Sequence, residues 1–254
     1  MTLTVVGTGR IGRVLASRVL LAGQALVAVS RKENRDSIEK PGGEGPIVIA
    51  VREEHLPELL PRIHPSHAPR LVFVQNGFVG EWMERIGARG RGLLHFNAAD
   101  DGTVRVLLPS VFGGSDAARE ACGILERGGI PSRFEEDPAK FRVEEIRKAL
   151  WSCVLSLLAA RKKIPVGRLF AESPEEIEAL TRECAEIAGA AFGVKTDVGD
   201  LLASLRTMAA RLPDYGGSAR GWEFRNLWLV RRARSLGIPT PQNDRALREC
   251  GIEA

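Results

Sequence analysis

A lysine and two serines recur at intervals of four residues in one segment of the chain: Lys148, Ser152 and Ser156. Residues four apart share one face of an α-helix, and residues 141–160 contain no Pro or Gly and consist mostly of strong helix formers. The second half of this segment is otherwise apolar almost all round, as in a helix that is buried on most sides. Since lysine is seldom buried without a partner, this face predicts a polar cavity wall, where Lys148 meets an anion or works at the cavity edge.

The alternative assignment of these three residues is structural. Lys148 would then end the exposed part of the helix, beside Glu144 and Glu145. Both serines would donate hydrogen bonds to helix carbonyls one turn earlier. The spacing alone allows both assignments, so the choice depends on what the rest of the chain supplies.

A glycine-rich turn near the start of the chain joins an apolar, strand-like run, residues 3–6, to a helical pattern over residues 13–22. The turn consists of Gly7, Thr8, Gly9, Arg10, Ile11 and Gly12. GxGxxG between a strand and a helix is the dinucleotide-binding fingerprint, in which the glycines allow a tight turn, approach of the pyrophosphate and close helix packing. N–H groups at the helix start then hold the phosphates. We expect all six residues to contact a dinucleotide; the alternative is a glycine-rich turn without a ligand.

The residues after the second predicted strand, residues 25–29, distinguish between two cofactors. NAD-specific sites usually carry Asp or Glu here for the ribose 2′-hydroxyl, but this chain has Ser30, Arg31 and Lys32. Ser30 and Arg31 can instead hold a 2′-phosphate, with the guanidinium as a fork-shaped donor, so we expect NADP(H). Arg52 follows the third predicted strand, at the edge of the sheet where ligands bind. The alternative is that Arg31 and Lys32 are solvated loop charges.

An asparagine follows the fourth predicted strand, in the run Gln75-Asn76-Gly77. At that strand end, the Asn76 amide can point at the nicotinamide and the substrate, although Asn-Gly is also an ordinary turn. Three histidines, His55, His64 and His67, suggest a metal at first sight. They lie in a Pro-rich connection without the cysteine or carboxylate cluster of metal sites, so we expect no metal.

Strands and helices alternate from residue 3 to residue 134, which predicts a doubly wound sheet of Rossmann type. From residue 141 onward the patterns are helical, over residues 141–160, 174–191, 197–211 and 219–236. Gly102 marks a hairpin in the run of residues 100–103. The predicted fold class is therefore α/β, with an NADP-binding domain at 1–138 and an all-helical substrate and catalytic domain at 139–254.

Composition excludes several classes of protein. The 254 residues carry a net charge of +4 without a basic stripe interleaved with aromatics, so we expect no nucleic-acid partner. No apolar run is long enough to span a bilayer and the N-terminus lacks a signal-peptide pattern, so we expect a cytoplasmic protein without a membrane partner. The four cysteines form no CxxC pair and are predicted to be reduced and packed: Cys122, Cys153, Cys184 and Cys250.

With these residues in place, the chain resembles the ketopantoate reductase (2-dehydropantoate 2-reductase) family along nearly its full length. The resemblance rests on four runs: GTGRIG at 7–12, QNG at 75–77, RKALWSCVLSLLAARKKIPVGRL at 147–169 and VRRARSLGIPTPQN at 230–243. It implies that Lys148 is the catalytic residue and that Asn76 is the asparagine of the family's NG turn. Ser152 and Ser156 stand where the family usually has two asparagines that hold the substrate, and Arg52 replaces a lysine near the cofactor.

Two departures from the family pattern concern the substrate. The family usually has a glutamate near the start of the last helix that binds the substrate hydroxyls, and alignment places Gly221 there. Either Glu223, two residues later, substitutes for it or the contact is lost. The chain is also shorter than typical members. The resemblance further implies a second domain like that of 6-phosphogluconate dehydrogenase and a place in pantothenate biosynthesis.

The expected function is NADPH-dependent reduction of a ketopantoate-like 2-keto acid to the 2-hydroxy acid in an interdomain cleft. Lys148 would donate the proton, and Asn76, Ser152, Ser156 and Glu223 would bind the substrate. A rival within enzymes is a reductase of another 2-keto acid or of a bulkier carbonyl, since serine is shorter than asparagine. A rival from another class is a protein that senses NADP(H) without turnover. A small-molecule keto acid is the expected partner, and a second copy of the chain could be another.

Overall fold

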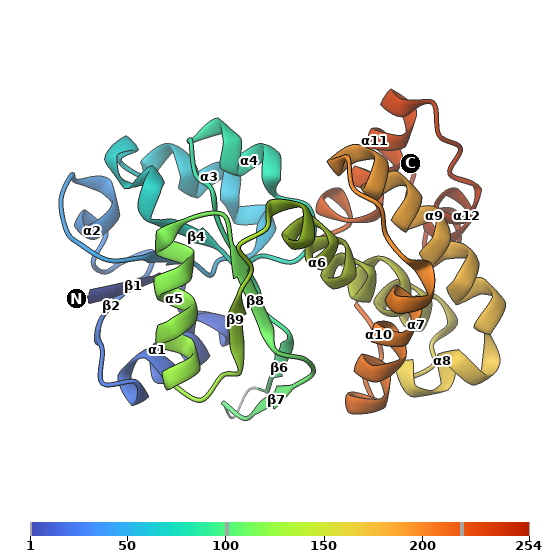
Figure 1. The fold of residues 1–254 in the computed structure, drawn as a ribbon, viewed down its shortest axis with the longest axis horizontal. Coiled ribbons are helices and arrows are strands. Elements are labelled where there is room, and N and C mark those ends of the chain that lie inside the picture. The colour runs from blue at the N-terminus through green and yellow to red at the C-terminus, as the bar shows by residue number, and fades with distance from the viewer. Residues whose placement is uncertain (1, 100–101, 219–220, 254) are drawn as a thin grey trace. The chain divides into compact units, whose positions relative to one another are not determined.

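The computed structural model describes residues 2–99, 102–218 and 221–253, and the remaining residues, 1, 100–101, 219–220 and 254, lie outside the description (Figure 1). The chain divides into two compact units. The first comprises Met1–Gln75 and Val79–Phe141, and the second comprises Asn76–Phe78 and Arg142–Ala254. The first unit holds a mostly parallel sheet with helices, and the described residues of the second are helical without strands. The predicted fold class is therefore confirmed.

The sheet of the first unit runs in the spatial order β2-β1-β3-β4-β5-β8-β9. β1 to β5 are parallel, β8 is antiparallel to β5, and β9 is parallel to β8. The strands are β1 (Thr2–Val6), β2 (Ala25–Val29), β3 (Ile47–Ile49), β4 (Leu71–Phe73), β5 (Gly90–Leu93), β8 (Ser110–Gly113) and β9 (Ser132–Phe134). β2 and β3 lie on opposite sides of β1, so the strand order reverses there. Ligands of such sheets bind outside the carboxyl ends of the strands at this point.

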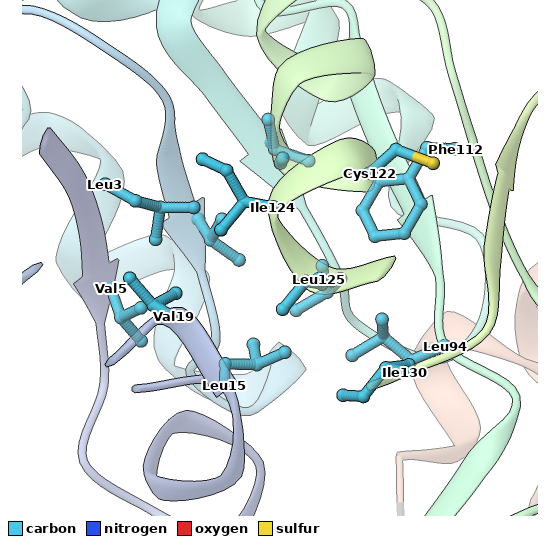
Figure 2. Close-up of a cluster of buried hydrophobic side chains, with 14 of the residues drawn as sticks. Leu3, Val5, Leu15, Val19, Leu94, Phe112, Cys122, Ile124, Leu125 and Ile130 are labelled. Atoms are coloured by element: carbon cyan, nitrogen blue, oxygen red, sulfur yellow. The ribbon is translucent and has the colours of Figure 1, made fainter. Parts of the chain in front are cut away.

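Two long helices of the first unit, α1 (Arg10–Leu21) and α5 (Asp116–Arg127), share one hydrophobic cluster with the sheet. Figure 2 shows Leu15 and Val19 of α1 in the same cluster as Ile124 and Leu125 of α5. The buried residues of each helix recur at helical spacing, which is the pattern of an amphipathic helix on a core. The Ser115 side chain accepts a hydrogen bond from the Ala118 N–H at 3.2 Å and so caps α5.

The remaining elements of the first unit are short. They are α2 (Asp36–Glu39), α3 (Leu56–Leu59), α4 (Gly80–Arg85), three 3₁₀ turns (Glu53–His55, Leu60–Arg62, Pro65–Arg70) and the hairpin strands β6 (Phe96–Ala98) and β7 (Val104–Val106). Residues 53–63 form several short pieces instead of one helix, because Pro57 and Pro61 remove two N–H donors. The predicted hairpin has β6 paired with β7 and Gly102 at a φ of +86°; residues 100–101 of the same prediction lie outside the described residues.

The second unit is built from helices around one long central segment. Its elements are α6 (Pro138–Leu150), a π-helical segment (Trp151–Ser156), α7 (Leu157–Lys162), α8 (Val166–Glu172), α9 (Pro174–Phe192), α10 (Val198–Arg211), α11 (Asn226–Leu236) and α12 (Pro241–Glu249). The division between the units falls inside α6, after Phe141. Within the parts of the chain that the structure describes, no helix is long and apolar enough to cross a membrane.

Two helix predictions for the second unit need correction. The helix predicted over residues 141–160 has a π segment in its middle instead of continuous α geometry. The helix predicted over residues 219–236 begins only at Asn226, because Gly221 has a φ of +69° and a 3₁₀ turn, Trp222–Phe224, precedes it. Residues 219–220 of that prediction lie outside the described parts of the chain.

Candidate functional site

The glycine turn joins β1 directly to α1, and two of its glycines are required by the backbone. Gly7 has a φ of +110°, and a Cβ atom there would lie 2.8 Å from the Ala50 carbonyl oxygen. A Cβ on Gly12 would lie 1.8 Å from the Gly7 carbonyl oxygen. Any side chain at either position would therefore collide with backbone, so the turn and its close packing depend on these glycines.

Gly9 is different, because no atom of the described residues comes within 4 Å of a Cβ built there. Gly9 is the N-cap of α1, and its carbonyl accepts the Arg13 N–H at 2.9 Å. The first turn of α1 contains no acidic residue, and Arg10 opens it. The open space at Gly9 thus adjoins a helix N-terminus, which favours a negatively charged group.

A cavity of about 460 Å³ lies at the carboxyl ends of the first three strands. Its walls include Gly7, Thr8 and Gly9 of the glycine turn, all within the first unit. One part of the lining is apolar and comes from Val29, Ile38, Ala50, Val51 and Leu59. This combination suits a dinucleotide, because an adenine ring needs an apolar wall while its phosphates need donors.

The polar lining of this cavity is mostly cationic: Arg31, Lys32, Arg35, Arg52 and Arg62 against Glu39 and Glu58. Two of the cations already pair with carboxylates, Arg62 with Glu39 and Arg52 with Glu54. Among the described residues, no ion pair joins Arg31, Lys32 or Arg35 to a carboxylate. These three cations follow β2, where an NAD site would place an acid.

Ser30 shapes the turn that carries these cations. Its Oγ accepts hydrogen bonds from the backbone N–H groups of Lys32, at 3.2 Å, and Glu33, at 3.1 Å. The hydroxyl proton is still available for donation, since both of these contacts use the oxygen as acceptor. Ser30 therefore fixes the loop and keeps its hydroxyl proton for a further hydrogen bond.

The Gln75-Asn76-Gly77 turn is held at both ends. Gln75 donates from Nε2 to the carbonyls of Ile49, at 2.7 Å, and Val51, at 3.1 Å, within the first unit. In the second unit, the Phe78 N–H donates to the Phe224 carbonyl at 2.7 Å, and the Phe78 ring stacks on Trp228 with 4.1 Å between centroids.

Gly77 leaves no room for another residue. It has a φ of +83°, and a Cβ there would lie 2.2 Å from the Phe224 carbonyl oxygen. The turn is therefore a fixed support for Asn76, whose own side chain is exposed.

Lys148 lies in the last turn of α6 and is partly exposed, directly before the π segment. Ser152 and Ser156 lie inside that segment and are buried. Because a π turn is wider than an α turn, the three residues depart from the straight stripe that α geometry predicts. The Ser156 hydroxyl accepts the Ser218 N–H at 2.9 Å and donates to the Ser218 carbonyl at 3.4 Å. It therefore fixes the 217–218 loop instead of bonding back to its own helix.

The π segment is supported by a chain of buried polar groups. The Asn226 side chain, fully buried, donates to the Cys153 carbonyl at 2.9 Å and to Asn243 Oδ1 at 2.7 Å. The Asn243 backbone and side-chain N–H groups both donate to Glu183 at 2.8 Å. A π turn removes carbonyls from the regular α-helical hydrogen bonds, and Asn226 supplies one of these carbonyls with a donor.

Arg225 lies next to Gly221, the residue that stands where the resemblance predicts a glutamate. A Cβ on Gly221 would lie 3.4 Å from Arg225 Nε, and a Cβ on Gly77 would lie 3.1 Å from Arg225 Cγ. The guanidinium thus fills space beside Gly221, and its stem passes the Asn76 turn. Burial raises the pKa of the Cys153 thiol to about 12, with the Arg225 charge acting in the opposite direction. Glu223, by contrast, is exposed.

Comparison with solved structures shows full-length similarity to 2-keto acid reductases. A ketopantoate reductase of Ralstonia eutropha JMP134 is 21% identical, with 97% of this chain and 96% of that chain covered and a TM-score of 0.72. A D-mandelate dehydrogenase with NADH and anilino(oxo)acetate is 13% identical, with 99% and 97% covered and a TM-score of 0.73. The dimeric ketopantoate reductase of Staphylococcus aureus is 14% identical, with 98% and 96% covered and a TM-score of 0.74.

The chain has the ketopantoate reductase fold. No protein-family model and no curated protein matches the sequence, so the similarity lies in the structure. The resemblance inferred from the sequence motifs is confirmed at the level of fold. The roles of the individual site residues stay predictions.

Within this ketopantoate reductase fold, Arg10, Ile11, Gly12 and Asn76 of the predicted cofactor residues do not line the cavity. The structure gathers the others on its wall, namely Gly7, Thr8, Gly9, Ser30, Arg31 and Arg52. It also adds cavity residues that the sequence reasoning did not assign to the cofactor, namely Arg35 and His55. Arg35 could have been found from the charge run after β2. No sequence motif indicates Arg225, because only the fold brings it beside Gly221 and Gly77.

His67 and the three buried cysteines, Cys122, Cys153 and Cys184, have packing roles. His67 is buried, with Nε2 donating to the Lys40 carbonyl at 2.8 Å and Nδ1 accepting from Arg70 at 3.0 Å. Burial raises the pKa of the Cys122 thiol to about 11 and also raises the pKa of the Cys184 thiol well above its usual range, so these thiols stay protonated at neutral pH. Among the described residues, no group of three His, Cys, Asp or Glu side chains could hold a metal ion.

Proposed function

We propose that the chain is an NADPH-dependent reductase that converts a 2-keto acid to the 2-hydroxy acid, with Lys148 as the proton donor. The observation that carries the proposal is the cavity at the strand ends of the first unit, which combines the glycine turn with cations after β2. The fold supports it, because ketopantoate reductases and a D-mandelate dehydrogenase share it over their full length.

The cofactor assignment follows the charges of this cavity. The N–H groups of the turn from Gly7 to Gly12, with Thr8, Arg10 and Ile11, would hold the pyrophosphate at the start of α1. Ser30 and Arg31 would bind the 2′-phosphate, since a guanidinium and a hydroxyl donor suit it and an acid would repel it. Arg52 would add a cation at the same edge. When bound, NADPH would supply the hydride.

Lys148 would donate a proton from Nζ to the carbonyl oxygen of the substrate as the hydride reaches the carbonyl carbon. A positioned acid contributes about 10²- to 10⁴-fold to the rate, and a cation aimed at the developing alkoxide adds electrostatic stabilisation. Asn76 and Ser152 would orient the substrate. Glu223 and Ser156 would make additional contacts to it. The case for a substrate contact is weaker for Ser156, because its hydroxyl already bonds to the Ser218 backbone.

The carboxylate of a keto acid needs a cation, and Arg225 is our candidate. Its guanidinium lies beside Gly221, where the family glutamate is missing, and its stem contacts the turn that carries Asn76. Exchange of an acid for a guanidinium in this region favours an anionic substrate over one recognised through its hydroxyls. The proposed substrate is therefore a 2-keto acid that need not be ketopantoate. A homodimer is part of the proposal, by analogy with the dimeric Staphylococcus aureus enzyme.

A second candidate function is a sensor that binds NADP(H) without turnover. Gly221 in place of the glutamate favours it, and so does the engagement of Ser156 with backbone. Retention of Lys148 and Asn76 supports the reductase instead, because a sensor has no use for a proton donor in that helix.

The test is NADPH consumption at 340 nm with a panel of 2-keto acids that includes ketopantoate, pyruvate, 2-oxoisovalerate and benzoylformate. The reductase proposal expects turnover of at least one of them, with the matching 2-hydroxy acid as product. Tight NADPH binding without turnover of any of them would favour the sensor. Absence of NADPH binding would overturn both.

A further inference from the structure

His55 lies on the wall of the same cavity and contacts one of its cations. It ends the 3₁₀ turn Glu53–His55 that follows β3, and its ring nitrogen Nε2 lies 3.3 Å from Nη2 of Arg31. Both residues line the cavity, although 24 positions separate them in the chain. The contact therefore joins the loop after β2 to the loop after β3, on either side of the glycine turn.

The direction of this hydrogen bond is fixed by chemistry. A guanidinium has only N–H donors, so Arg31 donates and His55 Nε2 accepts. The imidazole must then be neutral, with its proton on Nδ1. Arg31 has five N–H donors, and this bond occupies one of them, so two parallel donors can still engage a phosphate.

The contact matters because Arg31 is otherwise an exposed side chain on a loop. Long cationic side chains lose rotamer freedom when they bind, and that loss weakens affinity unless the side chain is held beforehand. The other two arginines of this wall, Arg52 and Arg62, do not hold the Arg31 side chain in place. Within the described residues, Arg62 is paired with Glu39 and Arg52 with Glu54.

We propose that His55 is a positioning residue for cofactor specificity: it holds the Arg31 guanidinium over the cavity in the orientation that binds the 2′-phosphate of NADPH. This inference rests on the proposed NADPH function. His55 acts through Arg31 and does not contact the nicotinamide or the pyrophosphate. Its effect is therefore confined to cofactors and fragments that carry a 2′-phosphate.

The experiment measures dissociation constants for NADPH, NADH, 2′-AMP and 5′-AMP in the wild type and in His55→Ala, His55→Gln and His64→Ala. His55→Ala should weaken NADPH and 2′-AMP about three- to tenfold, as expected for loss of one preorganised side chain, and leave NADH and 5′-AMP within about twofold. His55→Gln should recover most of the loss, because its amide oxygen can accept from Arg31. His64→Ala is the matched control, since His64 contacts Ser66 and does not line the cavity.

A double substitution separates positioning from direct contact. In an Arg31→Ala background, His55→Ala should have no further effect on NADPH affinity, because the residue that His55 holds is gone. A further loss there would mean that His55 binds the phosphate itself and would overturn the inference. So would an equal loss of NADH and NADPH affinity in His55→Ala, or no loss at all.

The two proposals fail in different ways. If the wild type binds NADPH no more tightly than NADH, the 2′-phosphate site does not exist and both proposals fall. If the wild type prefers NADPH but His55→Ala keeps the full preference, only the role of His55 is wrong. Melting temperatures of the variants check that each protein is folded.

Discussion

The two units of this chain differ in how their sites are built. In the first unit, the glycine turn is a short local segment, and a side chain at two of its three motif glycines, Gly7 and Gly12, would collide with backbone. In the second unit, the candidate groups come from segments that lie far apart in the sequence: Asn76, Lys148, Ser152 and Arg225. A site made of local backbone can be predicted from one motif, whereas a site made of distant side chains depends on several separate positions. The first unit carries the complete GxGxxG pattern, and the second carries Ser152, Ser156 and Gly221 where the resemblance predicts two asparagines and a glutamate.

The largest expected effects separate the two kinds of glycine in the turn. Gly12→Ala places a methyl group 1.8 Å from the Gly7 carbonyl oxygen. Overpacking of this kind costs about 1–3 kcal/mol, so the melting temperature should fall by about 2–12 °C, and NADPH binding should be lost.

Gly9→Ala is the matched comparison, since its Cβ meets no described atom within 4 Å. It should keep the wild-type melting temperature and still weaken NADPH, because the methyl group occupies the approach of the pyrophosphate. Thermal unfolding and cofactor titration of both variants make the check. Equal melting temperatures for the two variants would contradict the geometry of the turn.

Arg31→Ala should weaken NADPH about ten- to 150-fold and leave NADH nearly unchanged. The reason is the loss of a charge-assisted hydrogen bond to the 2′-phosphate, worth about 1.5–3 kcal/mol. Fluorescence titration of both cofactors measures it. Arg89→Ala, exposed and outside the cavity lining, is the control. A wild type with equal affinity for both cofactors would show that the cations after β2 are solvent-facing charges only.

Arg225→Leu tests the substrate side of the comparison. It should raise KM for the best keto acid at least about tenfold, the low end for a lost charge-assisted bond, while NADPH affinity stays unchanged. Leucine keeps much of the apolar stem that packs beside Gly77. Arg231→Ala, an exposed position on α11, is the control. An unchanged KM would show that Arg225 has a structural role and that the carboxylate binds elsewhere.

Asn226→Ala should lower the free energy of unfolding by about 1–3 kcal/mol, because the Cys153 carbonyl loses its buried donor. Urea unfolding measures the change. Gln242→Ala should be close to neutral, since the contact of Gln242 with Glu183 is made by its backbone N–H. If Asn226→Ala were as stable as the wild type, the π segment would not depend on this buried network.

The same contrast explains how much could be predicted from the sequence. The glycine turn, the strand–helix alternation and the helical second part follow from short-range patterns, and the structure bears them out. The π segment could not be predicted, because Trp151–Ser156 is mostly apolar, like an α-helical core segment. The Asn226 amide that donates to the Cys153 carbonyl within this segment lies 73 residues away in the chain. The position of Arg225 could not be predicted for a related reason, because it lies close to both Gly77 and Gly221 only in the folded chain.

The most direct test of the account is the effect of Lys148→Ala on turnover and on cofactor binding, measured with the best substrate of the keto-acid panel. Lys163→Ala, just beyond the end of α7, serves as the control. We predict that Lys148→Ala lowers kcat at least about 10²-fold, with the dissociation constant for NADPH within about twofold of the wild type and Lys163→Ala near normal in both. A Lys148→Ala enzyme with near-normal kcat would contradict the account, because the proton would then come from another group.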